Sequence, residues 1–363
     1  MQLSTIEEQW VSWRNKLLAS PKFRSLAAAF PLTRPVARRR AKAMFDINAG
    51  FIYSQIALAM VETGLIVRLA AGPLAVGDAA RFADLPIEST ERLLKAAAAL
   101  ELAQQLRDGR FVLGALGAAL HGNRGLAEMI DHHRHLYADL ADPVGLLRRG
   151  GGGGALARYW AYARVEDPTA NLDASVAPYS ELMAASQEMV AEQVLGAYRF
   201  RSHRRLLDVG GGQGVFVRAV KIARPTLEVA LFDLPAVAAR AGDVAIHGGN
   251  FFKDDLPTGF DLISLVRILH DHDDEPAMKL LRNIARSLAP GQQLMIAEPM
   301  AATDSAESMG DAYFGMYLWA MGSGRPRTKG QISAMLKRAG FAKIREIPTA
   351  IPLIARVLIA TRV

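Results

Sequence analysis

A glycine-rich segment at residues 206–214, LLDVGGGQG, constrains the fold of this chain more than any other feature. It follows an apolar run and precedes an amphipathic stretch that begins at Val215. Glycines between a buried strand and a helix let a ligand approach the backbone at the helix N-terminus. The spacing from Asp208 is D-x-G-x-G-x-G, whereas a dinucleotide fingerprint would place its third glycine at Val215. No Lys-Ser or Lys-Thr pair follows the glycines, which excludes a P-loop.

From residue 205 onward, short apolar runs alternate with amphipathic segments, which is the pattern of βαβ units in a parallel sheet. Four runs predict parallel strands: RLLDVG, EVALFD, DLISLVRIL and QLMIAEP. Two closing runs, KIREIP and ARVLIATRV, lie near enough to pair antiparallel at the sheet edge. Helices are expected between the strands at 215–223, 275–288 and 328–339, the last with Gly340 as its C-cap. The second half is therefore predicted to be an α/β domain.

The first half of the chain is instead rich in Ala, Leu and Arg with helical spacing. The stretch IESTERLLKAAAALELAQQL, at 87–106, predicts a helix leading into a tight Asp108-Gly109 hairpin, as in winged-helix domains. DNA binding is one interpretation, but the expected recognition helix offers few side chains that reach base edges, so we expect no nucleic-acid partner. Five glycines at 150–154 predict a flexible loop or a disordered tip.

Composition limits the kinds of site and the location. There is no cysteine, which excludes disulfides, Cys-based zinc sites and Cys nucleophiles. No apolar run looks long enough to span a bilayer, and charged residues interrupt the first twenty residues, unlike in a secretory signal. We therefore expect a cytoplasmic protein. The formal charge is +7, and a basic cluster, RPVARRRAK at 34–42, suits nucleic acid, anionic lipid headgroups or simply a solvated helix face.

A second carboxylate follows the next expected strand. Asp233, in ALFDLP, stands 25 residues after Asp208, where a carboxylate accepts hydrogen bonds from both ribose hydroxyls. A carboxylate beside the glycine loop would repel pyrophosphate but attract an ammonium group. This pair suits S-adenosylmethionine, a nucleoside with a cationic amino-acid end and no phosphate. A plain tight turn is the alternative.

Six consecutive ionisable residues, His270 to Glu275, follow the apolar run at 261–269. They could form a metal site, a catalytic base at a strand end, or a charged helix start. Ligands at 270, 271 and 272 cannot readily converge from one extended segment, and no second cluster has a familiar spacing to them. Acidic residues at 273–275 would suit the dipole of a first helical turn.

From about residue 45 to its end, the chain resembles the plant-type, class II family of S-adenosylmethionine-dependent small-molecule O-methyltransferases. The resemblance lies in the order and spacing of LLDVGGGQG, FDLP, GGNFF, ILHDHDDE, IAEP, and GRPRT before LKRAGF. It implies a Rossmann-like methyltransferase domain with a mostly parallel seven-stranded sheet, preceded by an all-helical winged-helix-like dimerisation domain. The expected boundaries are 1–125 for the dimerisation domain, 126–200 for a helical linker and acceptor-pocket region, and 201–363 for the catalytic domain. A homodimer is expected.

The resemblance also implies roles for individual residues. His270 would be the general base for the acceptor hydroxyl, and Glu298 would hold the other ring nitrogen and stabilise the imidazolium. Asp271 would either join them or cap the following helix. No metal is implied. The implied cofactor-binding residues are Asp208, Gly210, Gly211, Gly212, Gly214, Asp233, Asn250, Phe251 and Arg267.

Three positions depart from the family pattern. Asn250 stands where the family commonly has Asp, although its side-chain oxygen could still accept a hydrogen bond from the adenine amino group. Pro326 replaces a second Glu that flanks the histidine in plant members. Val266 replaces a cofactor-binding Lys, for which Arg267 is a candidate substitute.

The acceptor is expected to be small, lipophilic and hydroxylated. The stretch 309–324 is rich in Met and aromatic residues, and we assign substrate contacts to Met316 and Met321, with ordinary core as the alternative. The resemblance implies that Met183 also lines the methyl-transfer site and contacts the substrate. The segments FPLTRPVARRRAKAMFDINAGFIYSQ and AMGSGRPRT resemble the bacterial branch that methylates the C1 tertiary hydroxyl of acyclic carotenoids of the demethylspheroidene and hydroxyneurosporene type. A phenolic or polyketide hydroxyl is the alternative acceptor, and a non-catalytic winged-helix regulator is the alternative class. Because a carotenoid is collected at a bilayer, peripheral membrane contact through the basic cluster is also expected.

Overall fold

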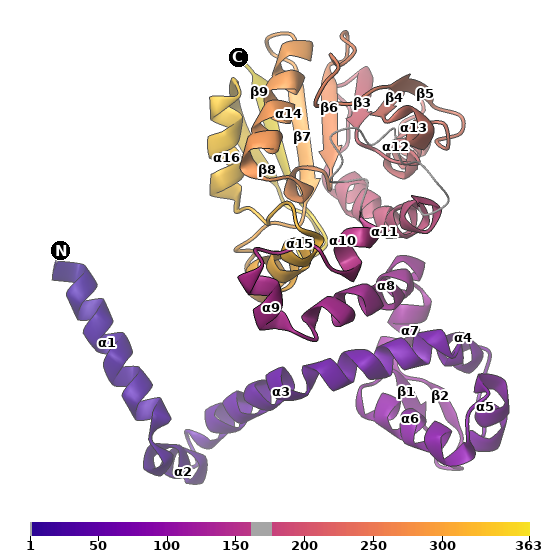
Figure 1. Ribbon diagram of the computed structural model, residues 1–363, viewed down its shortest axis with the longest axis vertical. Coiled ribbons are helices and arrows are strands. Elements are labelled where there is room, and N and C mark those ends of the chain that lie inside the picture. Colours follow the sequence, from indigo (N-terminus) through magenta and orange to yellow (C-terminus); the bar gives the residue numbers. More distant parts are fainter. Residues whose placement is uncertain (1, 161–175) are drawn as a thin grey trace. The chain divides into compact units, whose positions relative to one another are not determined.

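The computed structural model of the chain describes the backbone of residues 2–160 and 176–363 and the side chains of 5–160 and 186–363 (Figure 1). The chain forms two compact units, Met1–Ala118 and Ala119–Val363. The three-part division expected above, with boundaries after 125 and 200, stays a prediction.

The first unit is helical apart from one β-hairpin. Its helices are α1 (Gln2–Ala19), α2 (Pro21–Ala29), α3 (Arg34–Glu62), α4 (Leu65–Ala70), α5 (Val76–Ala83) and α6 (Ile87–Ala99). The hairpin pairs β1 (Ala103–Gln105) with β2 (Phe111–Leu113) across a turn that contains Gly109 at φ 86°. The predominantly helical character of this unit and the tight hairpin expected at Asp108-Gly109 are confirmed, whereas the helix expected over 87–106 ends at Ala99. Glu101 takes left-handed backbone (φ 57°), which ends the helix and lets the chain continue as a strand.

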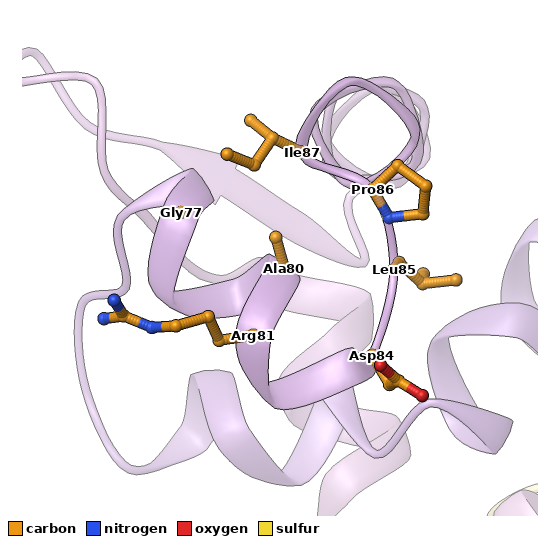
Figure 2. A pocket seen from close by; sticks show the side chains of 7 residues that line it. All are labelled: Gly77, Ala80, Arg81, Asp84, Leu85, Pro86 and Ile87. Atoms are coloured by element: carbon orange, nitrogen blue, oxygen red, sulfur yellow. The ribbon is translucent and has the colours of Figure 1, made fainter.

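A shallow hollow lies beside α5 and the start of α6 in this unit (Figure 2). Its volume is about 560 Å³. Its lining is made of Gly77, Ala80, Arg81, Asp84, Leu85, Pro86 and Ile87.

Helix α3 is 29 residues long and, by length and composition alone, could cross a membrane. Its most apolar window has a mean hydropathy of 1.3, and 17% of that window is buried within the chain. The expectation that no apolar run reaches this length was therefore wrong. Core helices of soluble proteins and signal sequences pass the same test of length and composition.

The second unit is built on a seven-stranded sheet of order β5-β4-β3-β6-β7-β9-β8 (Figure 1). Five strands are parallel: β3 (Arg205–Val209), β4 (Glu228–Asp233), β5 (Ala245–Gly248), β6 (Leu262–Val266) and β7 (Gln293–Glu298). Strand β9 (Arg356–Arg362) runs antiparallel to β7 and to the edge strand β8 (Phe341–Ile347), which confirms the expected edge pairing. The short, exposed strand β5 was not anticipated, because its sequence carries no buried alternation.

Helices cover both faces of this sheet. The predictions at 215–223, 275–288 and 328–339 are confirmed within one residue by α12 (Val215–Ala223), α14 (Asp274–Ser287) and α16 (Lys329–Arg338). Thr328 and Gln331 form a capping box at the start of α16, and Gly340 (φ 92°) follows its end. Side chains alternate along each strand, so Leu207 packs with α14 and α16, whereas Leu206 packs with α12 and α11 (Val176–Ala197).

Further helices complete the second unit. They are α7 (Ala115–His121), which begins in the first unit, α8 (Arg124–Leu140), α9 (Pro143–Arg148), α10 (Ala155–Tyr159), α13 (Pro235–Ala238), the π-helix η4 (Ser308–Phe314) and α15 (Gly315–Met321). An apolar cluster joins α8, α9, α10 and α15.

The five glycines at 150–154 form a packed turn in this region rather than a flexible loop or a disordered tip. The Gly152 N–H donates to the carbonyl of Trp319 at 2.9 Å. A Cβ added at Gly151 would lie 2.5 Å from the same carbonyl, and one at Gly154 would collide with the Asp139 carboxylate. The glycines are needed because the backbone passes so close to these neighbours.

Candidate active site

The candidate site lies at the carboxyl ends of the parallel strands. Strands β3 and β6 are neighbours, and the chain order reverses between them, which makes this crevice a topological switch point. The glycine loop follows β3, Asp233 ends β4, His270 follows β6, and Glu298 ends β7. Residues far apart in sequence are thus gathered at one edge of the sheet.

Asp208 is completely buried beneath the glycine loop. It stands opposite Ser264 in the pairing of β3 with β6, and the Ser264 hydroxyl donates to its Oδ1 at 2.6 Å. Its Oδ2 has no hydrogen-bond partner among the described residues. A Cβ at Gly211 would collide with this carboxylate, and one at Gly210 would lie 2.7 Å from Ile268 Cδ1. Burial raises the pKa of Asp208 to about 7, so a nearby cation would favour its charged form.

Asp233 is held by two backbone amides. Gly212 N–H donates to its Oδ2 at 2.8 Å and Leu234 N–H to its Oδ1 at 2.7 Å. Burial raises the pKa of Asp233 to about 6 against the opposing effect of these two bonds. Each carboxylate oxygen keeps a second lone pair, so the group can still accept bonds from two hydroxyls. This donor and acceptor set fits the ribose of S-adenosylmethionine.

The segment after β5 offers an apolar surface beside the glycine loop, since a Cβ at Gly210 would lie 3.5 Å from the Phe251 ring. The Phe251 ring packs edge-on against Phe252, with centroids 4.6 Å apart, and against His272 at 5.8 Å. The Asn250 side-chain oxygen accepts from Phe252 N–H at 2.9 Å, so it has one lone pair left for another donor.

His270 does not lie on a strand. The expected strand through Leu269 ends at Val266, because Arg267 takes left-handed backbone (φ 60°) and the chain turns into the 3₁₀ helix η3 (Leu269–Asp271). His270 is 4% exposed, and its Nε2 lies 3.0 Å from Asp271 Oδ1. Glu298 Oε2 is 3.9 Å from Nδ1 and accepts the backbone N–H of His270 at 3.1 Å. Asp271 is therefore the carboxylate within hydrogen-bonding distance of the ring.

The charges around His270 make it more basic. Burial alone lowers the pKa of His270, but the carboxylates of Asp271 and Glu298 raise it, and the net pKa lies above its usual value. Burial raises the pKa of Asp271, but the charge and hydrogen bond of His270, together with the charges of His272 and Arg267, outweigh burial and lower the pKa of Asp271. Burial raises the pKa of the fully enclosed Glu298. This environment stabilises an imidazolium that has taken up a proton.

Other expected residues are placed as follows. Arg267 Nη1 donates to the Ser186 hydroxyl on α11 at 2.7 Å. Met321 is fully buried and Met316 half-buried in the apolar cluster with Phe314, whose ring centroid lies 5.8 Å from that of His270. Met183 belongs to α11, but its side chain lies outside the described residues.

A pair of histidine–tyrosine contacts near the base was missed. His133 Nε2 lies 2.6 Å from the Tyr313 hydroxyl, and His132 Nε2 lies 2.7 Å from that of Tyr317. Trp160 Nε1 donates to the same Tyr317 hydroxyl at 3.1 Å. The run DHHRH on an amphipathic helix was the available signal, but its partners are about 180 residues away. The contact between Ser264 and Asp208 was also missed, because these residues are 56 positions apart in the sequence.

Across the described ranges, no group of three or more metal-ligating side chains lies together.

The family model for the O-methyltransferase domain matches residues 160–342. The demethylspheroidene O-methyltransferase of Cereibacter sphaeroides is 39% identical over 357 residues, which cover 96% of this chain and 94% of the relative. This chain belongs to the O-methyltransferase family. The protein is an S-adenosylmethionine-dependent O-methyltransferase of the plant-type class II group, as its motifs implied.

Two further comparisons place the methyltransferase among its relatives. The demethylspheroidene O-methyltransferase of Rhodobacter capsulatus is also 39% identical, over 97% of this chain and 90% of that relative. The solved structure of human N-acetylserotonin methyltransferase in complex with SAM has a TM-score of 0.76 over 89% of this chain and 97% of that one. At 22% identity the latter shows the shared fold alone, and it confirms the expected α/β architecture.

We expect the methylation rate to fall as the pH drops through the pKa of His270, because only the neutral imidazole accepts a proton. Asp271→Asn removes a charge that raises this pKa, so the acid limb of the kcat profile should move to lower pH and the plateau rate should fall. Glu275→Gln, an exposed change in the first turn of α14, is the control. An unmoved acid limb in Asp271→Asn would contradict the assignment of Asp271.

We expect Asp233→Ala to weaken S-adenosylmethionine binding, because it removes an acceptor for two hydroxyls at the end of β4. Isothermal calorimetry measures this directly, and loss of one charge-assisted pair corresponds to about tenfold or more in Kd. Glu228→Ala, at the exposed opposite end of the same strand, is the matched control. Equal affinities of the two variants would remove Asp233 from the cofactor site.

Proposed function

We propose that this methyltransferase methylates the C1 tertiary hydroxyl of an acyclic carotenoid of the demethylspheroidene or hydroxyneurosporene type, in carotenoid biosynthesis. The observation that carries the proposal is the 39% identity to two demethylspheroidene O-methyltransferases across nearly the whole chain. A 3-hydroxy-5-methyl-1-naphthoate 3-O-methyltransferase from Streptomyces sahachiroi is 29% identical over 85% of it.

Bound S-adenosylmethionine supplies an electrophilic methyl group. His270 takes the hydroxyl proton as the new O–C bond forms and the S–C bond breaks, which leaves a methyl ether and S-adenosylhomocysteine. Asp271 holds the ring and, with Glu298, stabilises the imidazolium until the proton leaves. General-base catalysis of this kind contributes about 10²–10⁴-fold.

The raised basicity of His270 suits the proposed acceptor. A tertiary alcohol holds its proton more tightly than a phenol, so it gains more from a base whose pKa is raised. The apolar and sulfur-containing side chains near Phe314, including Met316, suit a long hydrocarbon chain next to that hydroxyl.

A phenolic or polyketide hydroxyl is the second candidate acceptor. The His133–Tyr313 contact favours it, because both side chains carry groups that could hydrogen-bond a polar ring. Burial raises the pKa of Tyr313 to about 12, so its hydroxyl remains a donor at neutral pH.

We infer that the protein works as a homodimer joined through its first unit. In the described chain, α3 carries large apolar side chains that are exposed: Met44, Phe45, Ile47, Phe51 and Ile52. Ile47 is 78% exposed and Phe51 is 68% exposed, which is costly for a solvated surface. A second copy of the same helix would cover them.

We further infer a salt-sensitive contact with anionic membranes. The first 42 residues hold nine Lys and Arg but two Asp and Glu, an excess of seven charges that equals the formal charge of the whole chain. The stacked rings of Trp10 and Trp13, both more than half exposed, and Leu32 at 80% lie in the same region. Tryptophan and basic side chains together suit the interface of a bilayer.

The acceptor test uses radiolabelled S-adenosylmethionine with a 1-hydroxy acyclic carotenoid in micelles, or with a hydroxynaphthoate. We expect the carotenoid methyl ether to be the main product, identified by mass spectrometry. His270→Gln should lose about 10²–10⁴-fold in kcat while it still binds the cofactor. The exposed change His247→Gln on β5 is the control. A faster reaction with the naphthoate would favour the second candidate.

The assembly test is multi-angle light scattering of the full chain. We expect a dimer, and we expect the double variant Ile47→Glu, Phe51→Glu to dissociate because each buried carboxylate would lack a partner. A fully active wild-type monomer would contradict the dimer.

The membrane test is co-sedimentation with anionic and neutral liposomes across a salt series. We expect binding to anionic vesicles that weakens with salt, since each basic residue contributes about 1 kcal/mol near such a surface. Changing Arg38, Arg39 and Arg40 to Gln should reduce it. Binding that ignores lipid charge would show the cluster to be a solvated helix face.

A further inference from the structure

Arg327, in the segment GRPRT, is a fully buried arginine close to the base. Its exposed fraction is 0%, and it heads the largest side chains of the described core that are fully enclosed. A guanidinium is costly to remove from water unless its donors are paired. The hydrogen-bond partners of Arg327 therefore indicate which part of the structure this buried charge stabilises.

The side-chain hydrogen bonds of Arg327 reach the base segment, residues 267–274, which carries His270. Arg327 Nη1 donates to the Leu269 carbonyl at 2.8 Å, and Nη2 donates to the His272 carbonyl at 2.7 Å. Nε and Nη2 reach Asp274 Oδ1 at 3.0 and 2.8 Å. One rigid group thus holds the backbone on both sides of His270 and Asp271 and ties it to the start of α14.

The residues before Arg327 contact the same segment. Arg325 N–H donates to the His270 carbonyl at 2.9 Å, and the Ser323 hydroxyl donates to that of Asp271 at 3.1 Å. A Cβ at Gly324 (φ 83°) would collide with the His270 carbonyl. The chain at 323–327 therefore packs directly against the base segment.

The base segment has little regular structure of its own. It leaves β6 through the left-handed Arg267 and makes one short turn of 3₁₀ helix before α14. Such backbone keeps its conformation where the surroundings hold it. The hydrogen bonds of Arg327 fix the backbone on either side of His270. Proton transfer requires the His270 ring to be positioned to within a fraction of an ångström.

We propose that Arg327 is the positioning residue of the base: it fixes the His270 ring relative to Asp271 and Glu298 without touching a reacting atom. The inference rests on the proposed role of His270. It also involves charge, since burial raises the pKa of Glu298 and the charges of His270 and Arg327 oppose that rise.

The test compares Arg327→Lys, Arg327→Met and Asp274→Asn in the full-length enzyme with S-adenosylmethionine and the carotenoid acceptor. We expect Arg327→Met to lower kcat by about tenfold or more, part of the general-base contribution. Calorimetric affinity for S-adenosylmethionine should stay within about threefold, which separates lost positioning from lost binding. The acid limb of the kcat profile should move to lower pH, because a displaced ring loses the carboxylates that raise the pKa of His270.

Arg327→Lys should recover part of the rate, because an ammonium keeps the charge but cannot reach all three acceptors in one plane. Asp274→Asn keeps the buried charge and changes a half-exposed partner, so it tests the inference even if the Arg327 variants do not fold. It should shift the acid limb in the same direction by a smaller amount.

Arg362→Met is the matched control. Arg362 also donates to backbone carbonyls of separate elements, Ala285 at 2.8 Å and Gly340 at 3.0 Å, but contacts no residue of the base segment. It should lower the melting temperature and leave the pH profile unchanged. Wild-type kcat and pH profile in a folded Arg327 variant, or in Asp274→Asn if neither Arg327 variant folds, would overturn the inference. His270→Gln, measured in parallel, tells the two proposals apart, because a fully active His270→Gln overturns the base itself.

Discussion

The hydrogen bond from Ser264 to Asp208 joins the two central strands of the sheet where the chain order reverses. It forms because the parallel register of β3 and β6 places these two side chains opposite each other on one face. The glycine loop wraps over the Asp208 carboxylate, and the turn after β6 carries the base beside it. A slip of one strand by one residue would turn its side chain to the opposite face of the sheet, so that Asp208 and Ser264 could no longer form a hydrogen bond.

The site concentrates buried charge, and each charge is held by a specific partner. Backbone amides hold Asp233, Asp271 pairs with the His270 ring, and the His270 backbone N–H holds Glu298. Arg327 adds a positive charge that is satisfied by carbonyls and by Asp274. Burying such groups costs free energy, and buried ionisable groups of this kind are concentrated at functional sites.

The two units of the chain differ in how they bury their apolar side chains. The second has a core on both faces of its sheet and places Asp233, His270 and Glu298 at one edge of that sheet. The first leaves many large apolar side chains and an excess of positive charge on its surface. The proposed dimer and membrane contacts would both use this surface of the first unit.

Local sequence determined much of this protein. The D-x-G-x-G-x-G spacing, the apolar runs and the capping residues located four of the five parallel strands and the helices α12, α14 and α16, because strand burial and helix capping act over a few residues. The motifs also pointed to His270, Asp233 and Glu298. Tertiary structure alone decided that Asp271 rather than Glu298 lies within hydrogen-bonding distance of the ring, that Ser264 binds Asp208, and that Arg327 holds the base segment. It also packed the glycines at 150–154 against Trp319. Some of these contacts join residues that are distant in sequence, and others depend on a single residue with left-handed backbone, such as Arg267. The local periodicity of the sequence predicts neither kind of contact.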